Sequence, residues 1–101
     1  MASLRVDYSV HAMSHLESLY VYIAEDAGPI RAESFISSLM TYCEGLGSFP
    51  YRGTRRDDIR RGLRLLGYRR RVTIAFTVDE AAVIILGVFY GGRDVEAFLR
   101  S

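Results

Sequence analysis

The chain has 101 residues, half of them hydrophobic, and a formal net charge of +1. This length and apolar content exclude intrinsic disorder and predict a single domain over residues 1–101. One cysteine excludes an internal disulfide. Because the sequence shows neither a signal-type start nor an apolar run of about 18 residues, we expect a cytoplasmic protein.

A short strand and a helix are predicted first. LRVDYS (4–9) has the alternating character of a strand, and Ser9 is placed to cap a helix that runs to about Ala27. Two overlapping apolar stripes fit this helix: Met13, Leu16, Tyr20, Ile23 and Ala27, and Ala12, Leu16, Leu19 and Ile23.

A second helix follows almost at once. Gly28 suits the end of the first helix, and Pro29 suits the first turn of the next, which runs to about Leu46. Its stripe is Ala32, Phe35, Ile36, Leu39, Cys43 and Leu46. Two amphipathic helices joined by so short a turn predict an antiparallel αα-hairpin.

The segment 52–71, RGTRRDDIRRGLRLLGYRRR, concentrates positive charge. It holds nine arginines and two aspartates, a charge of +7, whereas the other residues hold four arginines and ten carboxylates, a charge of −6. All thirteen basic residues are arginine. Arginine favours two-point binding of carboxylate or phosphate. The alternatives are a solvated loop and a codon bias against lysine.

Alternation with a period of two begins within this band. It predicts strands over 62–68, 69–78 and 82–90, with a hairpin turn at 79–81. The last strand is apolar on both faces, as in a central strand, and a glycine break with about two helical turns closes the chain. We therefore predict an α+β fold of order βααβββ(α), with the αα-hairpin packed on one face of a twisted, mainly antiparallel sheet.

The middle strand presents two different faces. Val72, Ile74, Phe76 and Val78 are expected beneath the helices. The uncovered face is then expected to carry basic and hydroxyl side chains, namely Arg69, Arg71, Thr73 and Thr77, joined by Arg64 if the register allows. Five loop arginines, at positions 52, 55, 56, 60 and 61, are expected beside it.

Catalytic and metal-binding patterns are sparse. His11 and His15, one helical turn apart, supply half a metal site without a third ligand, which favours a solvated helix face. Cys43 lies on the apolar stripe and is expected to be a core thiol. Adjacent Asp57 and Asp58 cannot face each other as an acid–base pair. We predict no catalytic residue, no metal and no cofactor.

The order of these elements resembles a known family. The stretch PYRGTRRDDIRRGLRLL leading into RRVTIAF, followed by VIILGVFYGGRDVEAFL, is similar to the RelE/ParE superfamily, and most to its ParE branch of plasmid-stabilisation toxins. The resemblance extends from about Leu4 to Leu99. It implies the toxin of a type II toxin–antitoxin system, which inhibits DNA gyrase when its ParD-like antitoxin does not neutralise it.

The resemblance also leaves an alternative, a RelE-like nuclease that cuts messenger RNA on the ribosome. Arg70 or Arg71 and Arg93 fall near basic positions of that branch, but its lysines are absent and Phe98 stands where its tyrosine is expected. Arginine and phenylalanine are poor at moving protons near neutral pH, which favours the ParE branch. A module that only binds nucleic acid is a further alternative.

The arginine band is then expected to dock an acidic, partly disordered antitoxin tail. The predicted antitoxin-binding residues are Arg64, Tyr68, Arg69, Arg71 and Thr73. The resemblance implies a heterotetramer or larger complex, with operator DNA bound only through the antitoxin.

The C-terminal segment is predicted to form a short apolar face from Val95, Phe98 and Leu99. Two turns are too few to be stable alone, so this face must dock. One possibility is docking on the protein's own sheet. The other is contact with the target, for which the predicted residues are Arg93, Phe98, Leu99 and Arg100.

Overall fold

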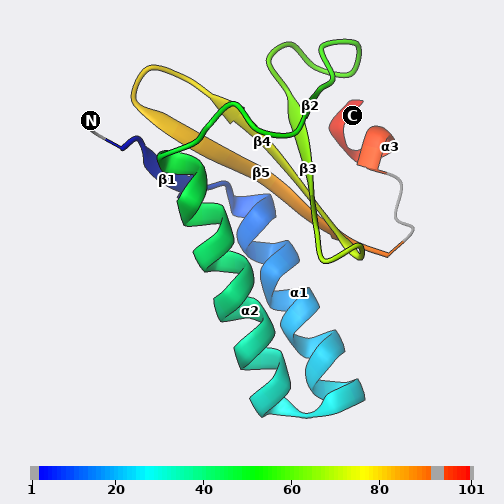
Figure 1. Cartoon of the computed structure of the whole chain (residues 1–101). Helices are drawn as coiled ribbons and strands as arrows, with labels where there is room; N and C mark the ends of the chain where they lie inside the picture. Colours follow the sequence, from blue (N-terminus) through cyan, green and yellow to red (C-terminus); the bar gives the residue numbers. More distant parts are fainter. Residues whose placement is uncertain (1–2, 92–94, 101) are drawn as a thin grey trace.

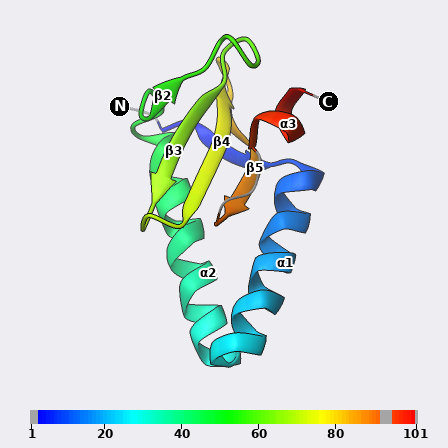
Figure 2. The same cartoon turned by 90° about the vertical axis from the view of Figure 1, so that its right-hand side faces the viewer.

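The computed structural model describes residues 3–91 and 95–100. A helical hairpin covers one face of a twisted sheet, and the far end of the hairpin projects beyond the sheet (Figures 1 and 2). The α+β architecture predicted from the sequence is confirmed. Within the described residues, no helix is both long and apolar enough to cross a membrane.

The two long helices begin and end at the predicted signals. Helix α1 spans Val10–Ala27, and the Ser9 Oγ accepts a hydrogen bond of 3.0 Å from the Ala12 amide at its start. Gly28, with φ of 94°, ends α1 and donates to the Ala24 carbonyl. Helix α2 spans Pro29–Glu44 and is followed by a 3-10 turn, η1, at Gly45–Gly47. The second helix thus ends two residues earlier than predicted.

The described residues form one sheet of five strands in the order β1-β5-β4-β3-β2. The strands are β1 (Arg5–Tyr8), β2 (Thr54–Arg55), β3 (Arg64–Tyr68), β4 (Val72–Val78) and β5 (Ala82–Tyr90). Strand β1 pairs parallel to β5, and the other neighbours pair antiparallel. The central position predicted for 82–90 is confirmed, whereas β2 was not predicted. Its two residues carry no alternation that a sequence pattern can detect.

The main core lies between the helices and the sheet. Ala12, Leu16 and Leu19 of α1 are buried there, while Met13 is 43% exposed, so the second of the two predicted stripes is correct. From α2 and η1, the core takes Leu39, Cys43 and Leu46. From β4 it takes Val72, Ile74 and Phe76, as the alternation predicted.

A second, smaller core lies on the opposite face of the sheet. Leu63, Ala75 and Phe89 are buried with Leu99 of helix α3 (Val95–Arg100). The prediction that this face is uncovered is therefore wrong. It failed because a helix of six residues docks across the sheet from the far end of the chain.

The turn between β3 and β4 differs from the predicted strand at 69–78. Tyr68 pairs with Val72, so residues 69–71 form the turn. Arg69 and Arg70 have φ of 48° and 66°, in the left-handed region that non-glycine residues seldom adopt. Because Arg69 and Arg71 lie in this turn and not in β4, they do not follow the alternation of the β4 side chains. The prediction that they share one face of the sheet with Thr73 is therefore wrong.

Gly53 is expected to tolerate no side chain, and Gly53→Ala should lower the free energy of unfolding by about 1–3 kcal/mol. Its φ is 81°, and an added Cβ would collide with the Leu65 carbonyl of β3. Gly45→Ala is the matched control, because Gly45 has φ of −62° and open space around a Cβ. Urea unfolding of both variants measures the difference; equal stabilities would contradict the close approach of this loop to β3.

Candidate interaction site

The fold divides the arginines of segment 52–71 into those that form ion pairs with described carboxylates and those that do not. Arg55 forms an ion pair of 2.9 Å with Asp57, and Arg56 contacts both Asp58 (2.9 Å) and Glu96 of α3 (2.6 Å). A hydrogen bond from the Gly62 amide is the main cause that lowers the pKa of Asp57, and the Arg56 hydrogen bond lowers that of Asp58. These contacts tie the loop that carries Arg55 and Arg56 to α3.

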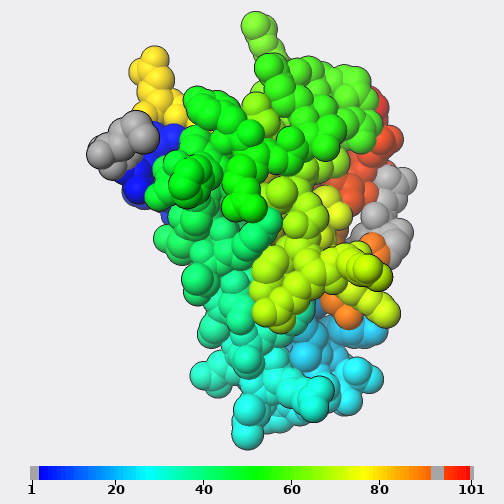
Figure 3. Space-filling model, viewed as in Figure 1, coloured from blue at the N-terminus to red at the C-terminus, as the bar shows by residue number. Residues whose placement is uncertain are grey.

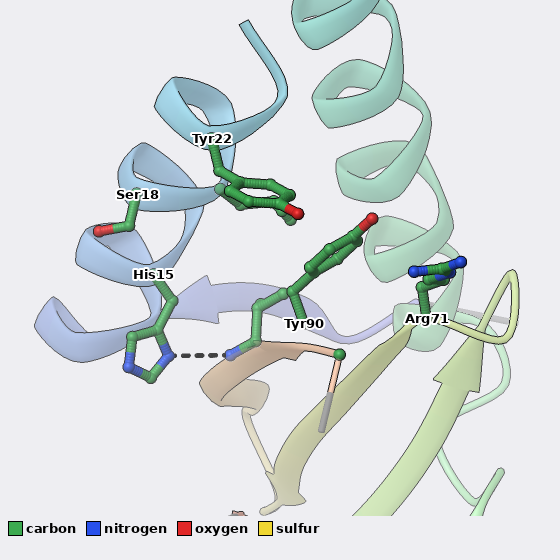
Figure 4. Close-up of a pocket in the computed structure, with 8 residues that line it drawn as sticks. His15, Ser18, Tyr22, Arg71 and Tyr90 are labelled. Atoms are coloured by element: carbon green, nitrogen blue, oxygen red, sulfur yellow. Dashed lines mark hydrogen bonds between the residues drawn. The ribbon is translucent and has the colours of Figure 1, made fainter. Parts of the chain in front are cut away.

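A second group of arginines lines a cleft between α1, the start of α2 and the ends of β4 and β5. Two adjoining hollows, of about 620 and 320 Å³, share Tyr22, Arg71 and Tyr90; we call them together the Tyr22–Tyr90 cleft. The two tyrosine rings lie 5.4 Å apart between centroids. Figure 4 shows Tyr22 from α1 facing Tyr90, with Arg71 beside the Tyr90 ring. The larger hollow adds Arg31 and Arg69.

These arginines are electrostatically available. Within residues 3–91 and 95–100, no carboxylate lies within 4.0 Å of the guanidinium of Arg31, Arg69 or Arg71. Asp26 also lines the larger hollow, at the end of α1. Three cations, aromatic rings and one carboxylate fit a ligand that combines acidic with apolar groups.

The predicted antitoxin-binding residues do not form one cluster. Arg69 lies over the Tyr68 ring at 5.1 Å, close to Arg71 in the cleft. Tyr68 itself is only 7% exposed and belongs to the main core. Arg64 faces the helix side but lies farther along β3, over the Tyr51 ring. Thr73 pairs with Phe89 and so points to the opposite face.

The C-terminal helix is held by rings and by ion pairs. The Phe98 ring lies between 5.1 and 5.3 Å from the rings of His11, His15 and Phe89. Leu99 is 7% exposed, in the second core. Arg100 remains exposed and reaches Asp58 at 4.0 Å. Among the predicted target-binding residues, Arg93 lies outside the described residues.

The chain is similar to known proteins both in sequence and in fold. The sequence profile of the family described as "ParE toxin of type II toxin-antitoxin system, parDE" matches residues 6–95. The chain belongs to the ParE toxin family. Its fold is similar to a solved structure titled "Chromosomal ParDE TA system from P. aeruginosa", with a TM-score of 0.76, 19% identity, and coverage of 88% of this chain and 97% of the other. No curated protein matches the sequence significantly.

The histidines of this ParE toxin have a structural role that the sequence did not show. His15 Nδ1 accepts a hydrogen bond of 3.1 Å from the Val88 amide (Figure 4), and its ring packs on Phe89 and Phe98. The expectation of a solvated helix face is therefore wrong for His15. The partners lie more than seventy residues away, beyond the reach of local patterns. In the described part of the chain, no group of acidic, histidine and cysteine residues could hold a metal.

The thiol of this ParE toxin is part of the core, as predicted. Cys43 is fully buried, and burial is the main cause that raises its pKa to about 11. Burial likewise raises the pKa of the neighbouring Tyr8. A protonated thiol without access to solvent is unsuited to nucleophilic attack. Among the described residues, Arg31, Arg69 and Arg71 thus line the cleft without a carboxylate partner. Arg31 was missed because it lies far from segment 52–71 in the sequence.

Proposed function

We propose that this ParE toxin inhibits DNA gyrase in the cytoplasm and is neutralised by a ParD-like antitoxin. Membership of the ParE family supports the toxin role. The observation that carries the partner is the Tyr22–Tyr90 cleft, where Arg31, Arg69 and Arg71 have no carboxylate partner among the described residues. An acidic antitoxin tail would supply carboxylates to these arginines and an apolar side chain to the tyrosines.

Different side chains of the cleft would set the association rate of the antitoxin tail and its affinity. Exposed arginines attract an acidic tail before contact, so they raise the association rate at low salt. The rings of Tyr22, Tyr90 and Phe35 offer apolar surface, which supplies most of the affinity once the tail is ordered. A complex assembled through the antitoxin's own dimer would then contain at least two copies of each chain.

The proposed target surface is the outer side of α3. Phe98 and Leu99 point into the protein's own core, so their proposed role changes from direct contact to holding the helix in place. Arg100, exposed at the end of α3, is left to meet the target. We propose protein inhibition without catalysis, because Cys43 is buried and His15 Nδ1 already accepts a hydrogen bond.

Two assays test the function. Purified gyrase should lose plasmid supercoiling, or accumulate cleaved plasmid, when the toxin is added, and the antitoxin should restore activity. Translating extracts should show no cleaved transcripts. Cleavage of transcripts together with unaffected gyrase would support the RelE-like alternative instead.

The double variant Arg69→Glu/Arg71→Glu should weaken antitoxin binding at low salt by about tenfold or more, because it places two carboxylates against an acidic tail. The control is Arg60→Glu/Arg61→Glu, which makes the same charge change outside the cleft. Titration calorimetry at low and high salt compares the two. Equal affinities for the two variants would rule out the cleft as the docking site.

A further inference from the structure

One side of the molecule interleaves arginines with aromatic rings. The guanidinium of Arg52 lies 5.1 Å from the Tyr42 ring centroid, and that of Arg64 lies 5.3 Å from the Tyr51 centroid. The Tyr42 ring is 4.9 Å from Tyr68, over which Arg69 lies. The 48–53 loop and the β3–β4 turn each border α2 at this surface (Figure 3), and Arg64 lies at the start of β3. We call the set the arginine–aromatic stripe: Tyr42, Phe49, Tyr51, Arg52, Arg64 and Arg69.

The stripe is positively charged and uncovered. Within the described residues, no carboxylate lies within 4.0 Å of the guanidinium of Arg52, Arg64 or Arg69. A hollow of about 390 Å³ between Tyr42 and Arg69 is lined by hydroxyl groups of α2 and by no acidic residue. Phe49 and Tyr51 are 69% and 71% exposed. The neighbouring Arg55 and Arg56, by contrast, form ion pairs with Asp57 and Asp58.

This geometry suits a phosphate backbone with unstacked bases. A guanidinium beside a ring has five N–H groups, so even where one of them donates to a neighbour, as Arg52 does to the Tyr42 hydroxyl, others can bind phosphate oxygens in pairs. Exposed ring faces stack with bases, and stacking is tolerant of sequence because every base has such a face. Bases inside a duplex already stack on one another. The exposed rings therefore favour a single strand over a duplex.

The residue types present in the chain limit which features of a nucleic acid such a site could recognise. The sequence contains no asparagine or glutamine, the side chains that pair with adenine edges. The side-chain acceptors nearest the stripe are hydroxyl groups of α2 and of the tyrosines, which accept a hydrogen bond from a ribose 2′-hydroxyl less strongly than a carboxylate or an amide oxygen does. We propose that the arginine–aromatic stripe binds single-stranded DNA without sequence preference. This activity goes beyond the proposed function, because it requires neither gyrase nor antitoxin.

The test is fluorescence anisotropy of a labelled oligothymidine of about 15 nucleotides, titrated with the full-length chain. Three phosphate-binding arginines predict that raising salt fourfold weakens binding roughly 15- to 20-fold. Tyr51→Ala and Phe49→Ala should each weaken binding about tenfold. Ile30→Ala is the control, since it truncates an equally exposed apolar side chain (84%) outside the stripe.

A second pair of variants isolates the charge. Arg52→Ala should weaken binding and reduce the salt dependence, whereas Arg60→Ala removes the same charge from a hollow beside α3, away from the stripe, and should leave binding nearly unchanged. Thermal unfolding of each variant verifies that it is folded. The proposal is overturned if no saturation occurs at low salt, if control and stripe variants behave alike, or if duplex DNA or oligouridine of equal length binds more tightly. Binding of an acidic peptide without binding of DNA would overturn it as well.

Discussion

Deleting residues 96–101 should abolish gyrase inhibition and also lower the free energy of unfolding by about 2–5 kcal/mol. The deletion removes Leu99 from the second core and exposes Leu63, Ala75 and Phe89 beneath it. It also removes Glu96, the second partner of Arg56. A domain of this size has roughly 5–15 kcal/mol of stability, so the remaining chain should stay folded and still bind antitoxin. Urea unfolding and a supercoiling assay measure the two effects.

Point variants separate the loss of stability from the loss of target contact. Leu99→Ala should destabilise the protein but inhibit gyrase in proportion to its folded fraction. Arg100→Ala should leave stability nearly unchanged, because a surface ion pair at 4.0 Å contributes little, and should reduce inhibition. Full inhibition by the truncated chain would show that the target surface lies elsewhere. An unchanged urea midpoint would show that α3 does not dock in solution.

Phe76→Ala should lower the free energy of unfolding by about 3–5 kcal/mol, the largest loss expected from a single substitution in this protein. Phe76 is the largest of the fully buried side chains and lies in β4 between the helices and the sheet. Its removal leaves a cavity that rigid strands on both sides cannot close. Urea unfolding monitored by circular dichroism measures the loss.

The control for Phe76→Ala is again a truncation at an exposed position. Ile30 is 84% exposed at the start of α2, so Ile30→Ala removes apolar atoms that are already in contact with water. Its stability should remain close to that of the parent. A similar loss for both variants would mean that the effect of Phe76→Ala arises outside the folded core, in the unfolded chain.

The second core links the two halves of the proposed function. His15, from the helical hairpin, contacts Phe98 of α3, and α2 of the same hairpin contributes Arg31 to the Tyr22–Tyr90 cleft. His15 also lines the smaller hollow of the cleft, so the cleft and α3 adjoin at this side chain. An antitoxin bound in that hollow would therefore lie close to a target bound at α3.

The sequence alone was sufficient to predict the family and the order of all the described elements except η1 and β2. Ser9, Gly28 and Pro29 act on the backbone within one helical turn, so their effects can be read without knowledge of the fold. The alternation of Val72, Ile74 and Phe76 likewise identified the face that the helices cover. Full burial of Cys43 followed from its place on the apolar stripe of α2.

Only the tertiary structure decided what the arginines do. Whether a guanidinium pairs with Asp58, lies over Tyr42 or opens into the Tyr22–Tyr90 cleft depends on side chains from other elements, which arginine composition does not specify. The register that pairs Tyr68 with Val72 forced Arg69 into a turn at positive φ, although arginine carries no turn signal. Long-range packing also brought α3 onto the face expected to be open, because six residues gain stability only by docking.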